Sequence, residues 1–178
     1  MSIHRTHPFA TPAASRDAAR RFRGRLVSPV TLWAAGEGRE RRGLTVSSVL
    51  VALGEPARVV GLLDPDSELA SGLGERGTVT ILTRADQHLA DVFAGLAPSP
   101  GGPFRAAPFE QDAWGPVLPG RSWVGIAWES ARELGWSTEV VGVIKHVHLA
   151  EADALTHVRG ATGASRAPSR EAIPLTTS

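Results

Sequence analysis

The stretch Arg42-Gly43-Leu44-Thr45-Val46-Ser47-Ser48 lies between two apolar runs and differs from both. The runs Pro29-Val30-Thr31-Leu32-Trp33 and Val49-Leu50-Val51-Ala52-Leu53 flank it, and together they predict a pair of strands. Three small hydroxyl residues are unusual in a strand, which favours branched or aromatic side chains. Hydroxyls, bare backbone amides and a nearby guanidinium suit an anionic group such as a phosphate monoester. A polar edge strand with solvated hydroxyls is the alternative interpretation.

The composition is that of a folded domain. The chain has 178 residues, of which 42% are hydrophobic and 21% charged, enough for one domain with its own core. Cysteine is absent, which excludes disulfides, thiolate metal sites and a cysteine nucleophile. No apolar run is long enough to span a membrane, and the N-terminus lacks a signal-peptide pattern. We therefore expect a cytoplasmic protein that does not enter membranes.

The charge balance argues against nucleic-acid binding. The formal net charge is +1, whereas affinity for a phosphate backbone needs a concentrated basic face. One local cluster of arginines precedes the first predicted strand and comprises Arg16, Arg20, Arg21, Arg23 and Arg25. Because only Phe22 offers a stacking partner there, we interpret the cluster as the solvated face of a short helix.

The first half of the chain predicts a helix and three strands. Residues 1–14 are rich in Pro, Ala and Thr without periodicity and read as a flexible arm. Ser15 is a candidate N-cap for a helix that runs through Phe22. Strands are predicted over residues 29–35, 43–53 and 57–63, separated by Gly- and Pro-containing turns.

The middle of the chain predicts two more helices. Ser67 is expected to open a short helix over residues 68–73, and a strand follows over 78–82. Asp86 is the candidate cap of a helix over 87–96, whose apolar residues recur at helical spacing. The long segment 97–120 is rich in Pro and Gly, and its aromatic residues Phe104, Phe109 and Trp114 favour an ordered surface loop.

The last part predicts two long strands, over residues 122–133 and 138–149, followed by a polar tail over 161–178. Many strands with a few short inserted helices favour a mainly β fold, a β-barrel, over a doubly wound sheet. We therefore predict one barrel domain over residues 15–160, between the arm and a disordered tail.

In this order, several segments resemble the flavin reductase-like family, whose members are FMN-binding split β-barrels. Gly43-Leu44-Thr45-Val46-Ser47-Ser48 is similar to the family's Gly-Met-Thr-Val-Ser-Ser segment. The other segments that carry the resemblance are Leu62-Leu63-Asp64-Pro65-Asp66-Ser67, Thr80-Ile81-Leu82 with Gln87-His88-Leu89-Ala90-Asp91-Val92-Phe93-Ala94-Gly95, and Trp114-Gly115-Pro116-Val117-Leu118. Four motifs in the family's order, over roughly residues 20–160, make the match moderately specific.

The resemblance implies a flavin in a groove at the interface of a homodimer. By this analogy the flavin-binding residues are Thr45, Val46, Ser47, Ser48, Asp64, Pro65, Ser67, Phe93, Ala94 and Gly95. The short helix that starts at Ser67 is expected to offer free amides to the phosphate. Arg41, Arg42 or Arg84 is a candidate guanidinium partner, and the sequence does not choose between them. FMN is the expected cofactor, with FAD as an alternative and NAD(P)H as a co-substrate.

One motif departs from the family. The family often carries Gly-Asp-His-Thr before its last long strand, with the histidine near the nicotinamide, whereas this chain has Gly135-Trp136-Ser137-Thr138. Hydride transfer is mainly the chemistry of the cofactors, so the loss weakens the case for a reductase without excluding it. Trp136 is interpreted as packing at a strand turn, with cover of the flavin face as the alternative.

No nucleophile or metal site is predicted. Ser47 and Ser48 have no partner base in the sequence, and no catalytic residue is assigned. His146 and His148 share one strand face, but a structural or solvent-facing pair is favoured over a metal site. His157 is the remaining imidazole that the resemblance places near the substrate, with an exposed histidine at a chain end as the alternative.

Three functions remain open at this point. The first is a dimeric NAD(P)H-dependent flavin oxidoreductase that supplies reduced flavin to a separate monooxygenase. The second is a flavin-binding carrier or sensor without nicotinamide-dependent turnover, which the missing Asp-His pair favours. The third is a barrel that has lost the flavin and serves as an interaction protein, with Trp136 filling the pocket.

Overall fold

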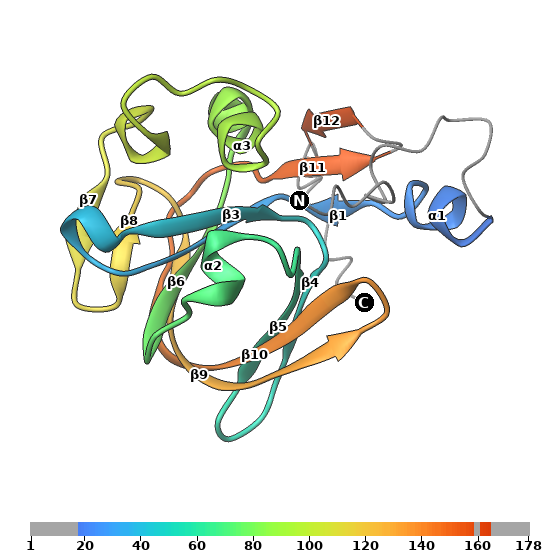
Figure 1. The fold of residues 1–178 in the computed structure, drawn as a ribbon, viewed down its shortest axis with the longest axis horizontal. Coiled ribbons are helices and arrows are strands. Elements are labelled where there is room, and N and C mark those ends of the chain that lie inside the picture. Colours follow the sequence, from blue (N-terminus) through green and yellow to red (C-terminus); the bar gives the residue numbers. More distant parts are fainter. Residues whose placement is uncertain (1–17, 159–160, 165–178) are drawn as a thin grey trace, which may run out of the picture.

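The computed structural model describes residues 18–158 and 161–164, and it is built mostly from antiparallel strands (Figure 1). The helices are α1 (Ala18–Arg23), α2 (Glu68–Ser71) and α3 (Gln87–Phe93), with short 3-10 turns η2 (Gly38–Glu40), η3 (Arg84–Asp86) and η4 (Pro103–Arg105). The strands are β1 (Ser28–Pro29), β2 (Thr31–Ala35), β3 (Arg42–Val46), β4 (Val49–Ala52), β5 (Arg58–Leu63), β6 (Arg76–Ile81), β7 (Glu110–Asp112), β8 (Gly115–Val117), β9 (Trp123–Leu134), β10 (Ser137–His148), β11 (Leu155–Val158) and β12 (Ala161–Ala164). The predicted mainly β fold with a few short helices is confirmed.

Seven of these strands form one curled sheet in the order β3-β2-β6-β9-β10-β5-β4 (Figure 1). Every pair in it is antiparallel. Its two edge strands, β3 and β4, follow each other directly in the sequence. Residues 47–48 therefore carry the chain from one edge of the sheet to the other.

This crossing corrects the prediction of one continuous strand over residues 43–53. The apolar pattern of β3 continues into β4, but β3 pairs with β2 whereas β4 pairs with β5. A single straight strand cannot be hydrogen-bonded to both partners when these lie at opposite sides of the curl. The chain bends at Ser47 and Ser48, where the structure has no strand.

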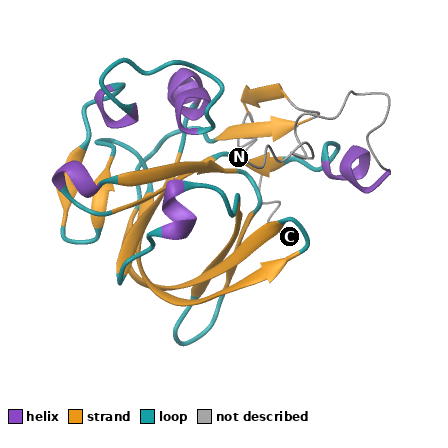
Figure 2. Cartoon of the chain, in the orientation of Figure 1, coloured by secondary structure: helices purple, strands orange, loops and turns teal. Residues whose placement is uncertain are grey.

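The inside of the curl is a packed apolar core. Trp33, Val59, Leu63, Ile126 and Val140 are essentially inaccessible to solvent, and they come from four strands of the sheet, β2, β5, β9 and β10. Helix α2 lies inside the ring of strands in the view of Figure 2 and adds the fully buried Leu69 to this core. The buried side chains alternate along β5, as expected for a strand with one face toward the core.

A second apolar cluster lies between the outside of the sheet and α3. Leu32 and Leu82 contribute from the sheet side, and Leu89, Val92 and Phe93 contribute from α3. Phe104 and Phe109 pack on Phe93 with ring centroids 5.0 and 5.8 Å away. The long segment 97–120 is therefore an ordered surface element with aromatic anchors, as predicted, and it also contains the small β7–β8 sheet.

Strands β9 and β10 form a long hairpin whose tip projects from the barrel (Figure 1). Trp136 lies at this tip and remains 72% exposed. Its interpretation as a residue packed at a strand turn is therefore wrong: the hairpin extends beyond the strands that would cover it. Trp136 also fills no pocket of the barrel.

Two boundaries differ from the prediction. Helix α3 ends at Phe93 rather than residue 96, because Gly95 adopts a positive φ of 70° that ends the helix. Ala161–Ala164, which we placed in the tail, form β12 and pair with β11. The predicted arm and the Ser15 cap lie outside the described residues, as does the rest of the tail.

Candidate flavin site

The bend between β3 and β4 meets the end of β5. The backbone carbonyl of Ser48 accepts a hydrogen bond from the amide of Leu62 at 3.0 Å. Two residues later β5 gives way to the turn that begins at Asp64. Folding thus brings together two of the three sequence segments that carry the predicted site residues.

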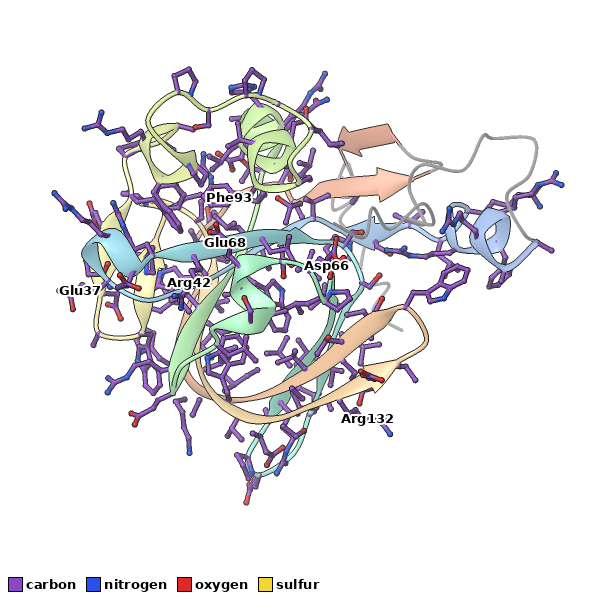
Figure 3. The ribbon with its side chains drawn as sticks, in the orientation of Figure 1. Glu37, Arg42, Asp66, Glu68, Phe93 and Arg132 are labelled. Atoms are coloured by element: carbon purple, nitrogen blue, oxygen red, sulfur yellow. The ribbon has the colours of Figure 1, made fainter. Side chains whose placement is uncertain are left out.

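The third segment, on α3, joins them through β3. The hydroxyl of Thr45 donates to the carbonyl of Ala90 at 2.8 Å. One turn further along α3, the Phe93 ring lies against Gly43 so closely that a Cβ on this glycine would be 2.6 Å from the ring. Glycine is therefore required at position 43 by the approach of an aromatic side chain, and Figure 3 shows Phe93 beside β3.

The predicted residues on α3 differ in accessibility. Phe93 is 5% exposed and belongs to the aromatic cluster, so its ring borders the site from within the protein. Ala94 and Gly95 are exposed at the end of α3. Val46 points into the barrel core, which leaves only its backbone, and its carbonyl already accepts from Thr31 Oγ1 at 2.7 Å.

The turn before α2 uses most of its polar groups internally. Ser67 caps α2 as predicted, because its hydroxyl oxygen accepts from the Ala70 amide at 3.1 Å. The same hydroxyl donates to the carbonyl of Asp64 at 2.6 Å. The amides of Asp66 and Ser67 are also bonded, to the Asp64 side chain and carbonyl respectively. The amides of Glu68 and Leu69, in the first turn of α2, have no acceptor among the described residues, as expected for a helix start. Pro65 has no amide to offer, and Asp66 and Glu68 lie beside the turn (Figure 3).

Ser47 is the least satisfied member of the predicted set. Thr45, Ser48 and Ser67 each have a side-chain hydrogen bond within the protein. Within the described part of the chain, neither the hydroxyl nor the amide of Ser47 has a hydrogen-bond partner, and the same holds for the amide of Ser48. Ser47 is only partly buried.

Arg23 reaches this bend from α1. Its Nη2 atom donates to the hydroxyl oxygen of Ser48 at 2.9 Å, although 25 residues separate them. Arg23 was not among the predicted site residues, because the cluster around it was interpreted as a solvated helix face, and α1 itself has no buried residue. The signal in the sequence was the cluster itself, but its position against Ser48 depends on the tertiary fold.

The arginines that the sequence offered as anion partners are engaged elsewhere or lie apart. Arg42 donates to the carbonyl of Gly72 at 3.2 Å and forms an ion pair with Glu40 at 3.4 Å (Figure 3). Arg41 donates to the carbonyl of Gly38 at 3.0 Å and lies over the ring of Phe104. Arg84 lies on the exposed turn η3.

The hairpin tip lies next to the turn after β5. Thr138 pairs with Leu63, so Ser137 and Trp136 extend past the end of β5 where Asp64 begins its turn. No histidine of the described chain stands at this tip. His146 and His148 lie at the other end of the hairpin, against Trp123, with ring centroids 4.8 and 6.0 Å from the indole.

The remaining candidates from the sequence add no chemistry here. Among the described residues, no group of three or more His, Cys, Asp or Glu side chains is arranged to hold a metal ion. His157 lies on β11, which pairs with β1. In the same part of the chain, no helix is long and apolar enough to cross a membrane.

Asp86 has a role other than the predicted one. Its side chain does not cap α3; it accepts from the amide and hydroxyl of Thr83 at 2.8 and 2.7 Å. Arg121 donates to the same carboxylate. Burial by itself raises the pKa of Asp86, but the hydrogen bonds from Arg121 and Thr83, with the charge of Arg121, outweigh it and hold the pKa below its usual value.

The described chain thus has a curled antiparallel sheet with hydroxyls and bare amides at the bend that joins its two edge strands. The family model described as the flavin reductase like domain matches residues 23–165, which is most of the chain. The chain belongs to the flavin reductase-like family.

Solved structures with the same fold include an NADH:FAD oxidoreductase and two flavin reductases. An NADH:FAD oxidoreductase of Streptomyces globisporus C-1027 has a TM-score of 0.76 and 21% identity, covering 89% of this chain and 96% of that chain. The styrene monooxygenase flavin reductase of Pseudomonas putida S12 has a TM-score of 0.74 and 20% identity, covering 85% of this chain and 99% of that chain. The flavin reductase component of a bacterial two-component tryptophan halogenase has a TM-score of 0.74 and 19% identity, covering 83% of this chain and 96% of that chain.

At these identities the likeness is one of fold. Among curated proteins, none matches this chain at a significant level.

Proposed function

We propose that this chain binds FMN at the bend between β3 and β4 and catalyses reduction of the flavin by NAD(P)H. Family membership supports the cofactor class and the reaction. The observation that carries the site is Ser47, whose hydroxyl and amide have no acceptor among the described residues, beside the Ser48 carbonyl that bonds to the end of β5.

The donors at the bend between β3 and β4 suit the phosphate of a flavin. Unpartnered hydroxyl and amide donors beside a guanidinium are the groups that hold phosphate oxygens. The Thr45–Ala90 bond and the contact between Gly43 and Phe93 fix the bend against α3, so these donors are held in place before a ligand arrives. When bound, the flavin itself supplies the hydride-accepting chemistry, and the protein positions it and limits its exposure to water.

A homodimer with the flavin near its interface is part of this proposal. A pocket of about 250 Å³ begins beside the bend and is lined almost entirely by apolar groups, among them Val49, Leu50 and Val51 of β4. Leu50 and Val51 are 64% and 55% exposed, and Leu149 on the same pocket is 80% exposed. Apolar groups continuous with a pocket mark an interaction surface, and a second copy of the chain is the proposed cover.

The proposed physiological role is delivery of reduced flavin to a separate monooxygenase. Two solved structures of the same fold are named as reductase components of two-component systems or of a monooxygenase. The chain is proposed to act in the cytoplasm, where NAD(P)H is supplied.

A flavin-binding carrier or sensor is the second candidate, and one observation favours it. The hairpin tip beside the Asp64 turn carries an exposed Trp136 and no imidazole. A carrier would bind FMN without accelerating the oxidation of reduced nicotinamide.

An anaerobic titration separates these candidates. FMN is added to the purified protein while tryptophan emission is recorded, and NADH or NADPH is then added while the visible flavin band is followed. Quenching followed by bleaching faster than in free FMN is expected for the reductase. Quenching without accelerated bleaching supports the carrier, and the absence of quenching overturns flavin binding.

Ser47→Ala tests the proposed position of the site. Loss of one donor to a charged group is expected to weaken FMN binding by about tenfold. Ser130→Ala is the matched control, because Ser130 is an exposed serine on β9 outside the predicted site. Equal FMN affinity of all three proteins would place the flavin elsewhere.

A further inference from the structure

Among the described residues, no carboxylate compensates the charge of Arg23. Three other well-placed arginines of the described chain form short ion pairs, which are Arg58–Glu129, Arg121–Asp86 and Arg132–Glu139. Arg23 instead donates to the neutral hydroxyl of Ser48, and within the described residues it has no ion-pair partner. A guanidinium has five N–H donors in a planar fork, so most of its hydrogen-bonding capacity remains available.

The position of Arg23 puts this capacity beside unpartnered donors. Ser48, which holds the guanidinium, follows Ser47 directly, and the amides of both residues and the Ser47 hydroxyl have no acceptor within the described chain. An acceptor group with several oxygens is the kind of ligand that can bond to the guanidinium and to a neighbouring donor at the same time. A phosphate monoester has three such oxygens and carries a charge of about −1.5 to −2 at neutral pH.

The way α1 is attached points to the same conclusion. None of its residues is buried, and Phe22 is 66% exposed, so apolar packing within this chain does not explain its position. Its contacts with the barrel are made by arginines three residues apart, which share one face of the helix. Arg23 bonds to Ser48, and the Arg20 guanidinium lies 5.9 Å from the centre of the Trp136 ring. Both contacts border the end of β5, where the predicted site continues into the Asp64 turn.

We propose that α1 is part of the flavin site and that Arg23, oriented by Ser48, binds the phosphate of FMN. This inference rests on the proposed function, because it assigns a residue to the phosphate of the same ligand. It replaces Arg41, Arg42 and Arg84 as the anion partner. The proposal also gives the arginine-rich α1 a function. This helix has no buried face, and its position beside Ser48 places the Arg23 charge at the ligand.

Riboflavin is the probe that isolates the phosphate, because it has the isoalloxazine and ribityl parts of FMN without the phosphoryl group. Dissociation constants for FMN and riboflavin are measured by tryptophan quenching on the wild type and on Arg23→Gln. The substitution is expected to weaken FMN binding by about tenfold to a hundredfold and to leave riboflavin binding unchanged. Arg23→Lys, which keeps the charge but not the planar fork, is expected to fall between them.

Arg21→Gln is the matched control. It removes the same charge from the same helix at an exposed position that has no side-chain hydrogen bond or ion pair among the described residues, so both affinities should stay at their wild-type values. Circular dichroism of each variant checks that the barrel is folded.

The outcomes separate the two levels of the proposal. Equal weakening of FMN and riboflavin by Arg23→Gln would mean that Arg23 only attaches α1, and it would overturn the inference while leaving flavin binding intact. If Arg23→Gln leaves the FMN affinity unchanged but lowers the affinity for NADPH and not for NADH, the charge of Arg23 serves the 2′-phosphate of the nicotinamide nucleotide. That result would also overturn the inference. A wild type that binds neither flavin would overturn the proposed function itself.

Discussion

The guanidinium of Arg121 donates to both carboxylate oxygens of Asp86, at 2.7 Å to Oδ2 and 2.9 Å to Oδ1. The pair joins the turn before α3 to the segment that enters β9, 35 residues later in the chain. The side chain of Asp86 is 11% exposed and that of Arg121 is 24% exposed, so the pair is largely screened from water. It holds α3 in register with the sheet that carries the predicted flavin site.

Asp86→Asn is expected to lower the free energy of unfolding by about 2–4 kcal/mol at neutral pH, because it leaves the Arg121 charge without its partner. Since the folded-state pKa of Asp86 is lowered, the stabilisation is present above the ordinary aspartate pKa of about 4 and is lost as the pH falls through the lower folded value. Urea unfolding of wild type and variant from neutral to acidic pH measures this. A stability difference that does not shrink at low pH would contradict the assignment.

Thr45→Val is expected to cost about 1 kcal/mol of stability, because it removes the hydrogen bond to the Ala90 carbonyl while keeping the side-chain shape. The cost stays moderate because that carbonyl also accepts from the Ala94 amide at 3.0 Å. Thr45→Ser, which retains the hydroxyl, is the control. The denaturant midpoint of Thr45→Val should be lower than that of Thr45→Ser. Equal midpoints would mean that the hydrogen bond contributes nothing to stability.

Gly43→Ala is expected to destabilise the protein by about 1–3 kcal/mol through overpacking against the Phe93 ring. Adding Phe93→Leu to Gly43→Ala should recover part of the loss, because it frees the space that the new methyl group needs. Gly54→Ala is the matched control, since its Cβ would meet only ordinary contacts. Thermal unfolding of the set tests it, and strictly additive effects would argue against direct contact.

Trp136→His is expected to leave the free energy of unfolding within about 0.5 kcal/mol of wild type, because the side chain is 72% exposed. If the hairpin tip borders the nicotinamide, the KM for NADH should change while FMN affinity stays the same. Steady-state kinetics measure the KM for NADH, and titration measures the FMN affinity of the variant. Leu134→His, on the same hairpin, is the control. Unchanged kinetic constants would remove the tip from the substrate site.

Leu50→Asp is expected to convert the proposed homodimer into monomers, because it introduces a charge beside the apolar pocket. Leu50 is already 64% exposed in the single chain, so the fold of each chain should persist. Light scattering coupled to size exclusion measures the mass, with Leu134→Asp as a control away from the pocket. A wild type that is already monomeric at working concentration would contradict the dimer.

Local features of this fold were predictable from the sequence, and long-range ones were not. Ser67 was found as a cap because a cap depends on residues three positions away. Asp86 was misassigned because its partner Arg121 comes from a distant segment that competes for the same carboxylate. The aromatic anchors Phe104 and Phe109 were found because aromatic residues in a Pro- and Gly-rich segment have few uses other than packing.

The candidate site shows the same division. The hydroxyl segment and the turn after β5 were located by their composition and their resemblance to the family. The break at Ser47 was missed because the apolar pattern continues across it, and only strand pairing shows that β3 and β4 have different partners. Arg23 was missed because nothing in the sequence of α1 indicates which surface it meets.

The crossing at Ser47 and Ser48 also means that the two edge strands of the barrel are joined by the polypeptide chain itself. Where other barrels close by hydrogen bonds between a first and a last strand, here a two-residue length of chain joins the edges β3 and β4. The edges cannot separate without bending this joint, and any widening of the curl must rotate its backbone. A ligand held by the donors of the joint would therefore resist that rotation, so flavin binding is expected to slow hydrogen exchange along both edge strands at once.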